Sequence, residues 1–425
     1  MAYEASEIMM AAAFLFTNKE LDEAASSLSK MANLMVEAKK KIQSTKTIEF
    51  GNATIERGFL ELMDADDPKK IKDLAAGISA AIGVREYIAK RGDSSVRRRA
   101  PTIYMTGNVW PKDVEKFKID SPVMKDYNSA DVIVTADKKT FFGLSLKKKD
   151  RVTATDPTLI NKAFGGILQG KQFDKLREDL EEIRINYFVD VVKEAVKKGI
   201  IDKADIRNYN SIIRSNPQEL FFAKQRDKQK FGKRAYINTK GYARSPKGYL
   251  DPNTKDPKSM RFFVNKKLAE KNNKLWDSFI KVMNKNAKLF ADTLLNIILK
   301  TELFDRLKAA DIKGKNFDFA LVTGIANMKK DSVEIGKADI LPLEATLCGL
   351  SRIEKNNELK EEKFVLAPYK VKDSDSAKVF LLLKRGNLNI LDLELRYKGE
   401  FSSQPQFQAT IHPMFKSLIK KECGL

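Results

Sequence analysis

The chain has 425 residues, with 78 lysines and arginines against 57 acidic residues and a formal net charge of +21. Positive charges in such excess repel one another in a compact protein, so we expect a polyanionic partner, above all nucleic acid. The alternatives are an anionic membrane surface or no charged partner. With two cysteines and the single histidine His412, zinc fingers and the usual Ser-His or Cys-His catalytic pairs are excluded, unless His412 serves alone. Any chemistry then rests on carboxylates, lysines, hydroxyls and a hard metal.

Residues 1–92 carry helical patterns. The apolar stretch 8–16 is about half of a bilayer crossing and lacks the basic residues of a signal peptide, so we expect a buried helix in a cytoplasmic protein without a membrane partner. Asp67-Pro68 is typical of a helix start. The apolar stripe that follows has helical spacing and consists of Ile71, Leu74, Ile78 and Ile82.

Residues 101–149 change to the two-residue period of strands. Short apolar runs at 103–105, 131–136 and 141–147 predict strands, and the last two are separated by a turn at 137–139. Asp156-Pro157 repeats the helix-start pattern and predicts another helix there. A long amphipathic helix is expected over about 173–198, ending at Gly199.

The second half of the chain begins with a stretch of a different kind. Residues 223–261 are rich in Lys, Arg, Gly, Pro and Tyr without periodicity, which indicates a long loop or linker. Helices resume over about 262–309. The last hundred residues predict a strand-rich unit, with a hairpin turn at Gly386-Asn387 and strands at 317–324, 364–368, 379–384 and 390–397.

These patterns predict an α+β protein with a helical N-terminal region, a mixed sheet flanked by helices and a strand-rich C-terminal unit. We divide it into a helical and α/β region at 1–215, a basic aromatic linker at 216–261 and a C-terminal domain at 262–425.

The most informative residues lie in the predicted hairpin. Asp131 begins its first strand, and Ser145, Lys147 and Lys149 share one face of the second strand, since side chains alternate. A carboxylate can hold Mg²⁺ against a scissile phosphate, and a lysine can orient water and neutralise developing charge. The alternative is an ordinary amphipathic hairpin whose lysine face is solvated.

An acid on one strand followed by S-x-K on the next resembles the PD-(D/E)XK nuclease superfamily, which includes many type II restriction endonucleases. The resemblance covers about residues 70–170. It implies a restriction-endonuclease-like core with Asp131 as the first acid and metal ligand, Lys147 as the catalytic lysine and Ser145 as a polar substitute in the acidic position of the triplet. A preceding helix often supplies a further carboxylate, and Glu86 fits that role as a second metal ligand; an exposed pair with Lys90 is its alternative.

Further residues fit contacts to nucleic acid. A helix starting at Asp156 would aim its N-terminus at phosphate together with Asn161 and Lys162, although a plain capped helix explains the same pattern. In the basic aromatic stretch, cations can meet phosphates and rings can stack on bases, unless it is a solvated linker. With Lys149, the expected contacts there are Lys230, Lys233, Arg234, Tyr236, Lys240, Tyr242 and Arg244.

In the C-terminal hairpin, Asp392, Glu394 and Arg396 alternate on one strand face. They fit either cross-strand ion pairs or a second metal site. A polar loop is expected at 399–407, whose Gln and Ser side chains suit base edges or phosphates.

The leading hypothesis is therefore a magnesium-dependent endonuclease, restriction-like or encoded by a phage, that hydrolyses DNA. The alternatives are a non-catalytic DNA-binding or virion-associated protein, or an RNA-directed equivalent. The resemblance implies DNA as the substrate. It also implies a homodimer, because restriction-type cutting of both strands usually needs two active sites.

Overall fold

The fold is that of a computed structural model of the whole chain. It describes residues 5–199, 263–299, 316–369, 378–396 and 406–424, apart from gaps at 46, 64–67, 92–93, 98–99, 107–108, 116–129, 155, 157, 159, 164–167, 169, 264–265, 271–272 and 331. The basic aromatic stretch at 223–261 and its predicted contacts, from Lys230 to Arg244, lie outside the described residues.

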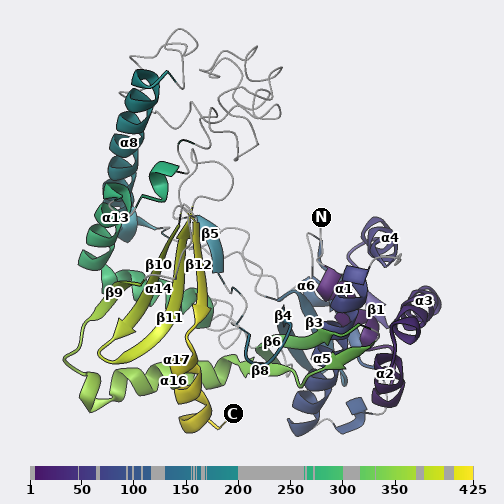
Figure 1. Ribbon diagram of the computed structural model, residues 1–425. Coiled ribbons are helices and arrows are strands. Elements are labelled where there is room, and N and C mark those ends of the chain that lie inside the picture. Colours follow the sequence, from purple (N-terminus) through teal and green to yellow (C-terminus); the bar gives the residue numbers. More distant parts are fainter. Residues whose placement is uncertain are drawn as a thin grey trace.

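The first sheet is mixed and seven-stranded (Figure 1). Its order is β1-β2-β3-β4-β6-β7, with β8 also paired to β6. β2, β3 and β4 are antiparallel neighbours, whereas β1 pairs with β2 and β4 pairs with β6 in parallel. The strands are β1 (Ile48–Glu49), β2 (Thr102–Met105), β3 (Val132–Thr135), β4 (Thr140–Lys149), β6 (Asn316–Met328), β7 (Val333–Ile335) and β8 (Asp339–Pro342).

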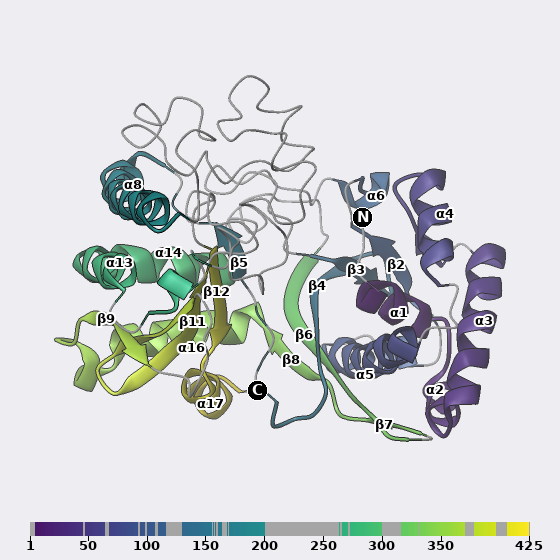
Figure 2. The same ribbon diagram turned by 45° about the horizontal axis from the view of Figure 1, so that its top comes forward.

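Helices from the N-terminal region cover one face of this sheet (Figure 2). They are α1 (Ala5–Ala13), α2 (Asn18–Ala25), α3 (Leu28–Ser44), α4 (Ala53–Leu62) and α5 (Pro68–Lys90). The core helix α5 lies against α1 and β6 at glycines: a Cβ on Gly77 would meet the backbone of Met9 and Met10, and one on Gly324 would meet the backbone oxygen of Ala76. These close contacts fix α5 along the sheet.

The second sheet is five-stranded and antiparallel, in the order β5-β12-β11-β10-β9. Its strands are β5 (Ile160–Ala163), β9 (Phe364–Tyr369), β10 (Lys378–Arg385), β11 (Leu388–Arg396) and β12 (Gln406–Ile411). From Leu391 onward the side chains of β11 alternate, so Leu391, Leu393 and Leu395 are buried while the residues between them are half-buried. The buried side packs on α14, where the rings of Phe290 and Phe407 lie 4.8 Å apart.

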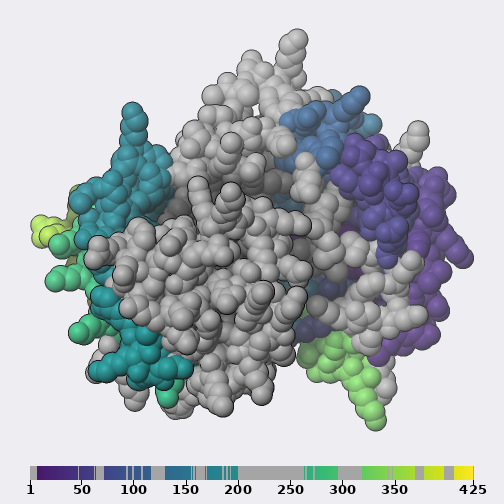
Figure 3. Space-filling view, turned by 90° about the horizontal axis from the view of Figure 1, so that it is seen from above, coloured from purple at the N-terminus to yellow at the C-terminus, as the bar shows by residue number. Residues whose placement is uncertain are grey.

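The remaining elements lie beside one of the two sheets or connect the two, and η1 and α6 lie on the side of the first sheet. They are η1 (Ser94–Arg97), α6 (Lys112–Glu115), η2 (Lys171–Phe173), α8 (Asp174–Lys197), α13 (Lys274–Lys285), α14 (Ala287–Leu299), α16 (Leu343–Lys355), η6 (Asn357–Leu359) and α17 (Pro413–Glu422). In the view of Figure 3, the teal α8 and the purple N-terminal helices lie on opposite sides of the molecule. Each sheet takes strands from both sides of residues 216–261, since β6 joins the first sheet and β5 joins the second.

The predicted α+β class is confirmed, as are the start of α5 at Pro68, the long helix α8 and the hairpin turn at Gly386, which has φ +54°. The helix expected after Asp156 is wrong, because residues 160–163 form β5. The carboxylate of Asp156 does not cap a helix but pairs with Lys149 and Lys416. The sequence reading also missed β12 and the helices α16 and α17.

Within the described residues, no helix combines the length and the apolar character that crossing a bilayer requires. The cytoplasmic location stays a prediction.

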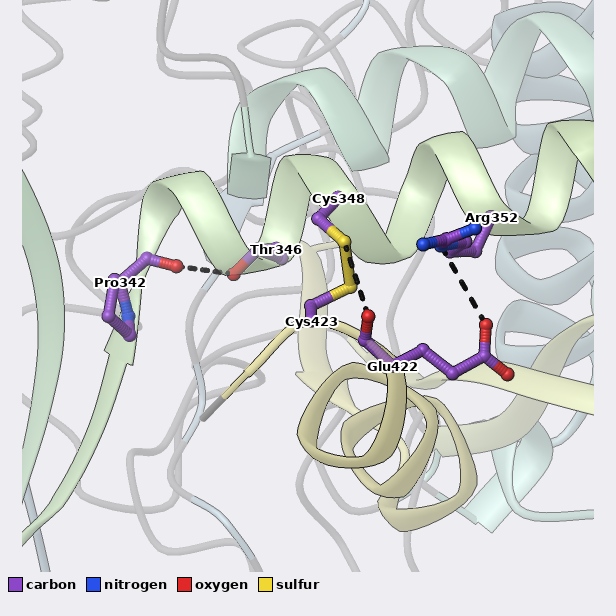
Figure 4. The surroundings of a disulfide bond; sticks show 6 residues. All are labelled: Pro342, Thr346, Cys348, Arg352, Glu422 and Cys423. Carbon is purple, nitrogen blue, oxygen red and sulfur yellow. Dashed lines mark hydrogen bonds and ion pairs between the residues drawn. A yellow bond between two sulfur atoms is a disulfide. The ribbon is translucent and has the colours of Figure 1, made fainter.

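A disulfide joins Cys348 of α16 to Cys423, directly after α17 (Figure 4). This pairing was not predicted from the sequence. Close by, Thr346 donates a hydrogen bond to the Pro342 carbonyl oxygen over 3.0 Å. The disulfide therefore fixes the C-terminal end of α17 against α16. The hydrogen bond of Thr346 in turn links α16 to Pro342 at the end of β8.

We expect reduction of this disulfide to lower the free energy of unfolding by about 2–4 kcal/mol, because it closes a loop with a sequence separation of 75 residues. Urea unfolding with and without reductant, with thiols counted to confirm reduction, measures the effect. The Cys348→Ala/Cys423→Ala double variant should not respond to reductant. Identical unfolding curves for oxidised and reduced wild type would contradict a stabilising role.

Candidate functional site

The hairpin of β3 and β4 is set by a short polar turn. Asp137 Oδ1 accepts hydrogen bonds from the backbone N–H groups of Lys139 and Thr140, each over 2.8 Å. Burial raises the pKa of Asp137, but these and other hydrogen bonds outweigh it and hold the pKa below its usual range. Lys138 takes the left-handed conformation, with φ +58°. The turn thereby fixes the register of the strands that follow it.

Asp131 lies where β3 begins, directly beside the S-x-K triplet of β4. Val132 pairs with Leu144. The Asp131 backbone N–H donates to the Leu144 carbonyl over 2.8 Å, and Asp131 Oδ2 accepts the Leu146 N–H over 2.6 Å. The carboxylate thus contacts the backbone between Ser145 and Lys147. The structure brings together these three predicted residues.

The three consecutive lysines at the end of β4 differ in their partners. Lys148 pairs with Asp73 of α5, whose side chain is 3% exposed. Lys149 pairs with Asp156 over 2.6 Å and is itself only 7% exposed. Lys147 is half-buried, and none of the ion pairs among the described residues involves it. Lys147 therefore has its charge uncompensated by a paired carboxylate within this part of the chain.

Glu86 does not join this group. Its helix, α5, packs on the face of β4 that carries Phe142, as the 6.0 Å ring contact between Tyr87 and Phe142 shows. Ser145 and Lys147 alternate onto the other face. The structure therefore does not bring Glu86 to Asp131 and Lys147, and its role as a second metal ligand stays a prediction.

A row of paired positions connects the hairpin with the middle of the molecule. Lys147 is opposite Thr323 of β6, and Thr323 is opposite Asp339 of β8. Paired residues lie on the same face, and two strand spacings are about 10 Å. Thr323 is buried. The face that carries Lys147 is thus continuous with an acidic position contributed by the far end of the chain.

Asp339 belongs to a buried ion-pair cluster of Lys149, Asp156, Asp339 and Lys416, which we call the Lys416 cluster. Lys416 lies on α17; its Nζ contacts Asp156 Oδ2 over 2.7 Å and also pairs with Asp339. All four side chains are less than one-fifth exposed. One ammonium group therefore joins the segment after β4, the strand β8 and the C-terminal helix.

The ion pairs of the Lys416 cluster shift the pKa values of Asp156 and Lys416. Burial raises the pKa of Asp156, but hydrogen bonds from Lys149 and Lys416 outweigh it and leave the pKa below its usual range. Burial lowers the pKa of Lys416, but its hydrogen bonds to Asp156 and Asp339 have the larger, opposite effect. The pKa of Lys416 is therefore above its ordinary value. Both groups stay charged at neutral pH.

A groove of about 1400 Å³ lies above the Lys416 cluster, between the two sheets. One wall comes from α5 and β8 and includes Glu86 and Lys90. The other is the polar face of the five-stranded sheet, with Phe380, Glu394 and Gln408. Asp131, Ser145 and Lys147 are not among the described residues that line it.

Among the residues predicted to contact nucleic acid, the structure describes Lys149, Asn161 and Lys162, and their surroundings differ from the prediction. Lys149 is held by Asp156 inside the Lys416 cluster. Asn161 and Lys162 lie in β5, paired with Gln408 and Phe407 of β12, and not at a helix N-terminus. Glu394 of β11 forms the expected cross-strand ion pair with Lys378 of β10, and a second ion pair with Arg396 of its own strand.

Metal binding by protein groups alone has little support among the described residues. They contain no group of three or more His, Cys, Asp or Glu side chains placed to hold a metal ion. Asp131 is the one carboxylate that we find beside the triplet in this part of the chain.

No protein-family model, no curated protein and no solved structure matches the chain.

We expect Lys416→Met to lower the free energy of unfolding by about 2–4 kcal/mol at neutral pH, because it leaves two buried carboxylates short of a partner. Chemical denaturation measures this, with Lys421→Met on the exposed side of α17 as the matched control. A loss no larger than that of Lys421→Met would contradict the structural role of the cluster.

The same variant gives a pH test. Because the pKa of Asp156 in the folded state is below its ordinary 3.8, its contribution is present above that pH and is lost as the pH falls through the lowered pKa. Lys416 contributes below its ordinary 10.5 and ceases to do so as the pH rises through its raised pKa. The stability difference between wild type and Lys416→Met should therefore narrow at both extremes; a constant difference would contradict the pairing.

Proposed function

We propose that the chain is a magnesium-dependent nuclease whose hydrolytic site is the β3–β4 hairpin, with Asp131, Ser145 and Lys147 as its residues. The observation that carries the proposal is the state of Lys147. Lys147 is half-buried, and the Asp131 carboxylate contacts the backbone next to it. The neighbouring lysines form ion pairs instead, Lys148 with Asp73 and Lys149 with Asp156. A half-buried cation without a paired carboxylate is suited to an anionic substrate.

The residues present fit a metal ion that arrives with substrate better than one held in a complete protein cage. Mg²⁺ is commonly bound through one or two carboxylates, with waters and substrate phosphates as its other ligands. Asp131 would supply the carboxylate, and the Ser145 hydroxyl is a neutral oxygen on the neighbouring strand. When bound, the ion would neutralise charge on the scissile phosphate.

The roles of the side chains follow from their chemistry. The Lys147 ammonium can hold a phosphate oxygen or orient the attacking water, and it stabilises the negative charge that grows in the transition state. Asp131 Oδ2 is tied to the Leu146 N–H, which keeps the carboxylate at the triplet before substrate arrives. The net charge of +21 favours the approach of a polyanion.

The mixed sheet with helices on its face, and an acid and a lysine triplet on adjacent strands, supports membership in the restriction-endonuclease-like class as part of this proposal. DNA is the proposed substrate, and RNA is the second choice; both belong in the assay.

We expect Asp131→Ala and Lys147→Ala each to reduce Mg²⁺-dependent cleavage by about 10²-fold or more, because the first removes the proposed metal ligand and the second removes the cation that stabilises the transition state. Cleavage is measured on supercoiled plasmid, on linear DNA and on single-stranded RNA. Lys139→Ala, on the exposed turn of the same hairpin, is the matched control and should cut like wild type.

Cleavage that survives both substitutions would exclude this site. Tight, strongly salt-dependent binding without any cleavage would instead support the non-catalytic nucleic-acid-binding alternative.

A further inference from the structure

The polar face of the five-stranded sheet has its own pattern of side chains. Lys378 of β10 pairs in register with Arg396 of β11, and Arg396 pairs with Gln406 of β12. The next row across the same strands is Phe380, Glu394 and Gln408. Phe380, Glu394 and Gln408 line the groove, and Arg396 and Gln406 follow them at the next register position. We call these residues the sheet platform.

The sheet platform holds buried polar atoms that have no hydrogen-bond partner. Among the described residues, such atoms are Arg85 Nε, Glu394 Oε1, Arg396 Nε and Gln406 Oε1, so three of the four lie together here. Glu394 Oε1 has an ion-pair contact of 3.4 Å to Arg396, but without hydrogen-bond geometry. Buried polar groups are nearly always paired, since leaving them unpaired costs free energy. Their concentration on one face indicates that a ligand completes them.

The charges on this face are balanced. Glu394 Oε2 contacts Lys378 over 3.3 Å, and Arg396 adjoins the same carboxylate. With Asp392 on the same strand face, two cations face two anions. A phosphate group prefers an excess of cations, whereas a neutral ligand rich in hydrogen-bonding groups suits a balanced face. The expected ligand is therefore a neutral planar group.

The donor and acceptor pattern narrows the ligand. The atoms without a hydrogen-bond partner comprise two acceptors, on Glu394 and Gln406, and one donor, on Arg396. A complementary ligand edge has amino hydrogens beside an acceptor. Adenine, cytosine and guanine carry an exocyclic amino group next to a ring nitrogen or carbonyl, whereas thymine and uracil have none.

The position of the platform decides how the base is presented. Reading an intact duplex requires an element that enters the DNA groove, such as a helix or a two-stranded ribbon. The row of Phe380, Glu394 and Gln408 is instead a wall of a groove between two sheets, and Arg396 and Gln406 lie one row further along the same strand face. Only a base separated from its pair can place its edge against such a wall.

We infer that the sheet platform binds the amino-bearing edge of an unpaired nucleobase, with Glu394, Arg396 and Gln406 as the reading residues. The choice of a nucleobase rests on the proposed action on nucleic acid. The platform is a specificity site separate from the β3–β4 hairpin.

The test measures binding without cleavage. Fluorescence anisotropy in EDTA compares labelled single-stranded oligonucleotides of about ten nucleotides, oligo(dA) and oligo(dC) against oligo(dT). We expect oligo(dA) and oligo(dC) to bind roughly five- to tenfold more tightly than oligo(dT), and Gln406→Leu to abolish this preference. Gln43→Leu, exposed on α3, is the matched control and should keep the preference.

Stability separates a binding role from a structural one. Gln406→Leu removes a buried acceptor that has no partner, so its Tm should equal or exceed that of wild type while the base preference is lost. Equal affinity for all three oligonucleotides, no binding to any of them, or a preference that survives Gln406→Leu would each overturn the inference.

The outcomes also separate this inference from the proposed function. Lys147→Ala should keep the base preference, because Lys147 lies on the other sheet. A preference that depends on Gln406 in a protein that never cuts would contradict only the nuclease proposal. Cleavage that depends on Lys147, without any base preference, would contradict only the sheet platform.

Discussion

The parallel pairing of β4 with β6 is the interaction on which the rest of the structure depends. Ten consecutive pairs, from Thr140–Asn316 to Lys149–Ile325, join the first part of the chain to the last. On one face these strands pack under α1 and α5; on the other they carry Lys147, Thr323 and Lys149. Because the ladder sets the register, it decides which of the three lysines meets Asp73, which meets Asp156 and which has neither.

The Lys416 cluster fastens the second sheet to this ladder. Its ammonium group joins residues separated by 260 and 77 positions in the sequence, and α17, which carries it, is held to α16 by the disulfide. The groove above the cluster thus has one wall on each sheet and a charged base between them. A rigid base of this kind keeps the two walls at a set separation, which any ligand that contacts both requires.

The sequence predicts those features of the fold that depend on interactions between residues close together in the chain. The Asp-Pro start of α5, the stop after α8 and the hairpin turn at Gly386 depend on backbone preferences of a few residues, and so does the juxtaposition of Asp131 with the S-x-K triplet. The same Asp-Pro signal failed at Asp156, because its carboxylate pairs with Lys149 and with the distant Lys416 instead of capping a helix. Neither Lys416 nor the side of the sheet on which Glu86 lies has a local signal, since both are fixed by long-range pairing.

Metal binding at the β3–β4 hairpin, as proposed above, can be tested directly. Iron(II) in place of magnesium, with ascorbate and peroxide, cleaves a protein backbone close to the bound ion, and mass spectrometry locates the breaks. In the presence of a non-cleavable oligonucleotide we expect breaks near residue 131 and at 145–147, and their loss in Asp131→Ala. Breaks centred on Glu86 or on the Lys416 cluster, or a pattern unchanged by Asp131→Ala, would contradict the proposed site.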